Sequence, residues 1–159
     1  VPAMERGVID ATEWIGPYHD YLQGFHKAAE YYYYPGWQEP QTVTELMINK
    51  SAFDALPPYL QNIIRTAAAR STHLVLSEFD AKNNTYLEKL VREEGVKLRK
   101  FPESVLEALR KHANDSVADI VERDAFSKKT YESYKNFQKM VAGWSDIGEK
   151  VYFSDILKS

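Results

Sequence analysis

Two short runs organise this chain: IDATEWIGPY at residues 9–18 and YYYYPGWQEP at residues 31–40. Each run passes from apolar residues into a pair of glycine and proline, and such a pair ends extended structure. We predict a short strand over residues 8–11 and a second one over residues 31–34, because aromatic residues favour strands. The first strand ends in residues 12–15.

Each run also carries a carboxylate and an indole where the predicted strand ends. Glu13 precedes Trp14, and Glu39 follows Trp37. Because side chains at the ends of neighbouring strands face one crevice, these four residues form a candidate ligand site. A carboxylate at a strand end is commonly a cap or a surface charge instead, and this alternative stays open.

Composition limits the class of protein. The 159 residues are 44% hydrophobic, with a net charge of −3 and a pI near 5.8, so they offer one core and no basic field for nucleic acid or a membrane surface. Cysteine is absent, which excludes disulfides and thiolate zinc sites. Residues 1–7 are typical of the last turn of a helix ended by glycine. We therefore expect a piece of a longer protein, and the lack of a leader peptide is uninformative.

The rest of the pattern is mostly helical, which predicts a helix-rich α/β chain. Helical spacing covers residues 17–30, 51–55, 58–94, 102–121 and 125–157. Strand-like runs occupy residues 42–48 and 96–101. We expect three regions: ligand-lobe strands and helices with the site motifs over 1–49, a helical packing region with one short strand over 50–124, and a long C-terminal helix region over 125–159.

The predicted C-terminal helix carries one apolar face, here called the aromatic stripe. Its members recur at three-to-four spacing and are Tyr131, Tyr134, Phe137, Met140, Val141 and Trp144. Lysines lie on the opposite face, so the stripe needs a partner. We expect it to pack against another lobe or a second subunit, and the alternative is its own lobe.

Other features have competing interpretations. The tyrosine run at residues 31–34 fits packing or a sugar-stacking platform. His19 and His26 lie seven positions apart on one predicted helical face, which suggests either a metal site or two solvent-facing side chains. No third ligand accompanies them.

Several motifs together resemble the C-terminal half of the periplasmic solute-binding proteins of TRAP transporters, in the branch that binds 2-oxo and 2-hydroxy monocarboxylates. They are GVIDATEWIGP at 7–17, KAAEYYYYPGWQEP at 27–40, Asn49-Lys50, Leu56-Pro57-Pro58 and Leu60-Gln61. The resemblance implies part of a two-lobed type II periplasmic binding protein fold with long C-terminal helices. It also implies transport without catalysis, a membrane permease as partner, and a homodimer through the C-terminal helix.

The resemblance further implies a cation, Na⁺ or Ca²⁺, between protein and substrate. Its ligands would be the carboxylates of Glu13 and Glu39 and the main-chain carbonyl of Trp14, whose indole would contact the substrate. The physical chemistry agrees, because two carboxylates facing an anionic ligand repel it unless a hard, oxygen-ligated cation lies between them. The arginine that pairs with the substrate carboxylate in that family, and further amide ligands, are expected in the missing N-terminal half.

Two other functional classes are compatible with the residues. In a glycoside hydrolase-like enzyme, Glu13 and Glu39 would be the two catalytic carboxylates and the aromatic residues would stack on sugar rings. In a helical interaction module, the C-terminal helices would bind a protein partner, and Glu13 and Glu39 would lie apart in solvent.

Overall fold

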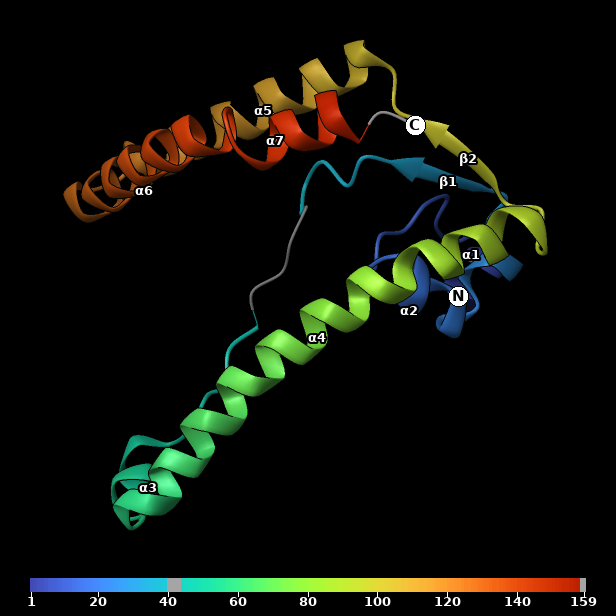
Figure 1. The fold of residues 1–159 in the computed structure, drawn as a ribbon. Helices are drawn as coiled ribbons and strands as arrows, with labels where there is room; N and C mark the ends of the chain where they lie inside the picture. The colour runs from blue at the N-terminus through green and yellow to red at the C-terminus, as the bar shows by residue number, and fades with distance from the viewer. Residues whose placement is uncertain (40–43, 158–159) are drawn as a thin grey trace. The chain divides into compact units, whose positions relative to one another are not determined.

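The computed structural model describes residues 1–39 and 44–157, and the chain divides into two compact units, Val1–Phe101 and Pro102–Ser159. Figure 1 traces the chain from the N-terminus in blue to the C-terminus in red. Each unit is described by itself.

The first unit begins with two short helices, α1 (Pro2–Glu5) and α2 (Pro17–Gln23). Proline begins α2 at a position where its missing amide costs nothing. The predicted helix over residues 17–30 ends early because Gly24 adopts a left-handed conformation (φ 76°), and a 3₁₀ turn, η1 (Phe25–Lys27), follows. The helical turn before Gly7 is confirmed.

Two parallel strands, β1 (Tyr31–Tyr34) and β2 (Lys97–Lys100), form the sheet of this unit. Tyr31 pairs with Lys97 and Tyr34 pairs with Lys100. Between them in the sequence runs α4 (Pro58–Arg92), the long helix coloured green in Figure 1. Gly95, with a positive φ of 71°, lets the chain turn back from α4 into β2. Both strands and the long helix were predicted.

Two predicted strands are absent from the described residues. Residues 8–11 carry no strand, and neither do residues 44–48; the rest of that second prediction, residues 42–43, lies outside the described residues. A strand needs a partner for its backbone N–H and C=O groups. Within the described residues, β1 and β2 pair only with each other.

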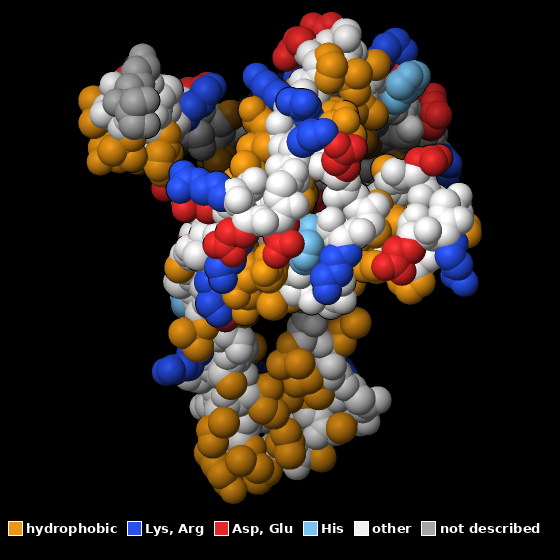
Figure 2. All heavy atoms as spheres, turned by 90° about the vertical axis from the view of Figure 1, so that its right-hand side faces the viewer, with side chains coloured by type: hydrophobic (Ala, Val, Ile, Leu, Met, Phe, Trp, Pro, Cys, Tyr) orange, Lys and Arg blue, Asp and Glu red, His pale blue; other side chains and the backbone are white. Residues whose placement is uncertain are grey.

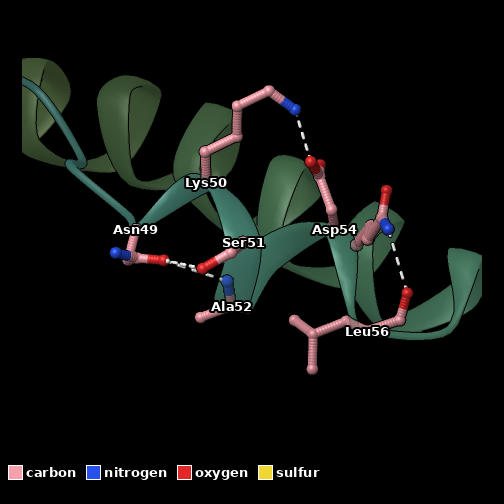
Figure 3. A network of polar contacts seen from close by, with 7 residues as sticks. Asn49, Lys50, Ser51, Ala52, Asp54 and Leu56 are labelled. Atoms are coloured by element: carbon pink, nitrogen blue, oxygen red, sulfur yellow. Dashed lines mark hydrogen bonds and ion pairs between the residues drawn. The ribbon is translucent and has the colours of Figure 1, made fainter.

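The predicted short helix is α3 (Lys50–Asp54), and a local polar network fixes its ends (Figure 3). Asn49 Oδ1 accepts the Ala52 N–H at 3.0 Å and the Ser51 hydroxyl at 2.7 Å, while Lys50 pairs with Asp54. The Gln61 side chain donates to the Leu56 carbonyl at 2.9 Å. The motif residues Asn49-Lys50, Leu56 and Gln61 thus hold the connection from α3 into α4.

The core of the first unit lies where α2, the second half of α4 and the sheet meet. Leu90 and Val96 are its buried hydrophobic residues, and they line a small cavity together with Phe25, His26 and Tyr32. His19 stacks on Phe79 and His26 stacks on Tyr21, with ring centroids 4.7 and 4.8 Å apart. Neither histidine faces solvent as one interpretation predicted.

The other end of this unit is apolar and exposed. Hydrophobic side chains gather around α3 and the start of α4 in Figure 2, where Met47, Tyr59 and Ile63 are exposed. Of the helices in the described chain, none is both long and apolar enough to cross a membrane.

The second unit contains α5 (Glu103–Val121) and α6 (Ala125–Ser145), followed by α7 (Glu149–Val151) and a π-helical turn, η2 (Tyr152–Ile156). The Asp124 carboxylate caps α6 by accepting the Ser127 N–H at 2.8 Å. The predicted helix over residues 125–157 is interrupted between Ser145 and Glu149. The aromatic stripe is largely exposed within this unit, including Phe137 at 60% and Trp144 at 70%.

Candidate ligand site

The three predicted site residues lie on two segments of the first unit. Glu13 and Trp14 belong to the irregular loop, residues 8–16, that leads into α2, and Glu39 lies in the segment that follows β1. All three are exposed, and Trp14 is half-exposed at 50%. Burial and Asp20 raise the pKa of Tyr32 in β1, and the negative charge of Glu13 adds a smaller contribution, so the loop that carries Glu13 passes near this strand.

A buried carboxylate, Asp20 in α2, joins the loop to the strand. Its Oδ1 accepts the N–H groups of Ile15 at 3.2 Å and Gly16 at 3.3 Å. Its Oδ2 accepts the Tyr32 hydroxyl at 2.6 Å. Asp20 also donates its own N–H to the Gly16 carbonyl at 2.9 Å, so the contact with the loop is reciprocal.

Burial and the Asp20 carboxylate act together on Tyr32. Burial raises the pKa of the Tyr32 phenol first, and the hydrogen bond to Asp20 and the negative charges of Asp20 and Glu13 raise it further. The phenol therefore stays protonated and remains a donor to Asp20 throughout the physiological pH range.

The long helix holds the loop from a second side. Asn83 in α4 accepts the Tyr18 N–H through its Oδ1 at 3.2 Å. A Cβ at Gly16 would lie 3.4 Å from the same oxygen, in van der Waals contact, so Gly16 packs directly against the Asn83 side chain. Asn83 thus satisfies an amide in the first turn of α2, which has no partner within its own helix.

An ion pair on α4 packs against the same helix. The Lys82 ammonium lies 4.5 Å from the centroid of the Tyr18 ring and 3.1 Å from its hydroxyl. Lys82 also pairs with Glu78, which raises the pKa of Lys82 and lowers that of Glu78. The pair is exposed, so it contributes little to stability.

The two segments carry oxygen atoms of the kind that a hard cation would take. Glu13 and Glu39 have carboxylates, the loop has main-chain carbonyls, and Ca²⁺ and Na⁺ prefer such oxygen ligands. Both oxygens of Asp20 are already hydrogen-bonded, so Asp20 is a support and not a further ligand. Within residues 1–39 and 44–157 no group of three or more His, Cys, Asp or Glu side chains converges on one point.

Sequence reasoning missed the support residues Asp20, Tyr32 and Asn83. Asp20 carried a usable signal, because an acidic residue in the first turn of a helix that begins with Gly-Pro can accept the amides of the preceding loop. Tyr32, the β1 partner of Asp20, lies 12 positions along the chain, and Tyr18, the α2 partner of Asn83, lies 65 positions away. No local pattern indicates either pairing.

Comparisons with protein families, curated proteins and solved structures agree with one another. Residues 1–124 match the model of the family described as bacterial extracellular solute-binding protein, family 7 (DctP). A curated relative from Nostoc sp. (strain PCC 7120), named a monocarboxylate 2-oxoacid-binding periplasmic protein, is 37% identical over 150 residues, covering 94% of this chain and 41% of the relative.

Two crystal structures are similar to this chain over almost all of its residues. The first is a TRAP transporter solute-binding protein from Bordetella bronchiseptica RB50, a mixed-occupancy dimer with copurified calcium and picolinate in one active site and an apo site (TM-score 0.87, 36% identity, 96% of this chain and 45% of that one). The second is a TRAP periplasmic solute-binding protein from Pseudoalteromonas atlantica T6c with bound sodium and pyruvate (TM-score 0.89, 36% identity, 97% and 47%). This chain spans less than half the length of these relatives.

Proposed function

Because this chain belongs to family 7 of the bacterial extracellular solute-binding proteins, we propose that it forms part of the substrate-binding subunit of a TRAP transporter. Its ligand would be a small 2-oxo or 2-hydroxy monocarboxylate, captured in the periplasm and delivered to membrane permease subunits. Support comes from the relative named for 2-oxoacids and from the neighbour with pyruvate. The family is a transport family, so we propose no catalytic role for Glu13 or Glu39.

We further propose that Glu13 and Glu39 hold a cation through their carboxylates, that the Trp14 main-chain carbonyl completes this part of the site, and that the Trp14 indole contacts the substrate. The cation would offset the repulsion between these carboxylates and an anionic ligand. Calcium and sodium each accompany a carboxylate ligand in one neighbouring structure. The remaining contacts to the substrate would come from parts of the protein that this chain does not include.

The observation that carries this proposal is the fixed loop bearing Glu13 and Trp14. Asp20 ties that loop to Tyr32 of β1, and the segment after β1 carries Glu39. The two halves of the proposed cation site are thereby attached to one scaffold.

The test is calorimetric titration of the full-length protein with pyruvate, in Ca²⁺ or Na⁺ and in a sodium-free buffer with chelator. Wild-type protein should bind only when one of these cations is present. Glu39→Gln and Glu13→Gln should each weaken binding by tenfold or more, since each removes an anionic ligand of the cation. Glu107→Gln, an exposed change in α5, is the control and should bind like wild type. Unchanged affinity of Glu39→Gln, or full wild-type binding in chelator, would contradict the proposal.

A further inference from the structure

We propose that Asp20 is a positioning residue: it orients the Trp14–Ile15 peptide so that the Trp14 carbonyl faces away from the core, toward the cation. This inference rests on the proposed function, because it concerns the main-chain ligand of the same site.

The direction of the Ile15 N–H determines the direction of the Trp14 carbonyl. The Trp14 carbonyl and the Ile15 N–H belong to one planar peptide unit, and in a trans peptide they point in opposite directions. Within the described residues the single cis peptide is Tyr34–Pro35, so the Trp14–Ile15 peptide is trans. Because the Ile15 N–H is directed at Asp20 Oδ1 at 3.2 Å, the Trp14 carbonyl must point away from Asp20.

The Asp20 carboxylate is buried and depends on its hydrogen-bond donors. Asp20 is only 8% exposed, and no lysine or arginine in the described part of the chain forms an ion pair with it. Its charge is compensated by three neutral donors: Ile15 N–H, Gly16 N–H and the Tyr32 hydroxyl. A buried charge that loses such donors becomes unfavourable. Rotating the Trp14–Ile15 peptide would remove the Ile15 N–H from the buried carboxylate, and this cost opposes the rotation.

The Asp20 carboxylate is itself held in place from two sides. Tyr32 donates to Oδ2 at 2.6 Å from β1, whose backbone is fixed by its pairing with β2. The reciprocal bond from the Asp20 N–H to the Gly16 carbonyl holds the start of α2 against the same loop. The orientation of the Trp14 carbonyl is thus determined before any ligand arrives, which lowers the ordering cost of binding.

The experiment compares four variants of the full-length protein: Asp20→Ala, Asp20→Asn, Tyr32→Phe and Tyr21→Phe. Cation affinity is measured with Ca²⁺ alone by calorimetry and with Tb³⁺ by indole-sensitised emission. Thermal unfolding without cation gives stability separately. Tyr21→Phe is the matched control, because it removes a phenol on α2 whose hydroxyl donates to the Glu94 carboxylate at 3.3 Å instead of to Asp20.

We expect Asp20→Ala to weaken Ca²⁺ binding by tenfold or more and Tyr32→Phe by at least threefold, while Tyr21→Phe binds Ca²⁺ like wild type even if its melting temperature falls. Asp20→Asn keeps one oxygen for the loop amides and should recover part of the affinity.

If Asp20→Ala fails to fold, the cation affinity of Tyr32→Phe tests the inference. Wild-type cation affinity in a folded Asp20→Ala, or in Tyr32→Phe, would overturn the inference, even where Glu39→Gln loses binding and the proposed function stands. Failure of the proposed function is a separate result: wild-type protein that binds neither Ca²⁺ nor pyruvate.

Discussion

Tyr32 shows how one half-buried side chain connects stability with pH. Burial, the hydrogen bond to Asp20 and the nearby carboxylates all raise the pKa of its phenol above the usual value of about 10. In the unfolded chain the phenol ionises near that usual value, while in the folded chain it keeps its proton. Folding therefore retains a proton that the unfolded state loses in alkaline solution.

The raised pKa of Tyr32 makes its contribution to stability depend on pH in the alkaline range. The stabilisation by Tyr32 is fully present below about pH 10 and is lost as pH rises toward the folded-state pKa, with a slope of at most about 1.4 kcal/mol per pH unit. The difference in unfolding free energy between wild type and Tyr32→Phe should be constant from pH 7 to 9 and shrink from pH 10 to 11. Denaturant titrations across this range measure it, and a difference that stays flat to pH 11 would disprove the role of Tyr32.

The sequence indicated candidate site residues but not the residues that support them. Glu13, Trp14 and Glu39 follow from breaker positions and from motif resemblance, and their role in binding stays a prediction. Asn83 acts through Tyr18, which lies 65 positions away, and Asp20 pairs with Tyr32 across the turn from α2 to β1. These pairings depend on which segments the fold brings together, and local sequence patterns do not indicate that.

Among the elements, local signals predicted helices well and strands unevenly. The pattern over residues 58–94 became α4 (Pro58–Arg92), because many apolar positions at helical spacing and a glycine stop agree. The run at residues 8–11 has strand-like composition, yet no strand forms there, since strand formation depends on a neighbour. Near the C-terminus, α6 ends at Ser145 and a new helical segment starts after Gly148, consistent with glycine as a weak helix former.

The contact between α2 and α4 gives a prediction about Asn83. Asn83→Ala leaves the part-buried Tyr18 N–H without its acceptor and should lower the unfolding free energy by about 1–3 kcal/mol. The neighbouring Asn84 is exposed on the same helix, so Asn84→Ala is the matched control and should be neutral or slightly stabilising. Urea denaturation of the full-length variants compares the two. Equal effects would show that the cap on α2 has no energetic role.

For the whole molecule, the predicted fold class is confirmed. The chain is helix-rich with a small sheet, and it shares the fold of TRAP periplasmic solute-binding proteins over at least 96% of its length. Composition suggested one ordinary core, but the structure has two compact units with few fully buried hydrophobic residues. The aromatic stripe of α6 is largely exposed in this chain.

We expect a second subunit or the other lobe to cover the aromatic stripe, because each large apolar side chain gains roughly 1.5–3 kcal/mol on burial. Deleting residues 143–159 from the full-length protein removes Trp144 and the segments that follow it. If the C-terminal region is exchanged between subunits, sedimentation should show monomers while circular dichroism shows folded protein. A deletion variant that remains dimeric would demonstrate that this segment does not hold the subunits together.

The parallel pairing of β1 with β2 has a consequence for the rate of folding. Tyr31 and Lys97 are neighbours in the sheet, but all of α4 lies between them in the sequence. Joining the strands therefore closes a long segment, and the lost chain entropy precedes any gain from strand hydrogen bonds. A helix forms within about a microsecond and shortens the segment that must still close. The speed at which the first unit reaches its native register thus depends on the early formation of α4.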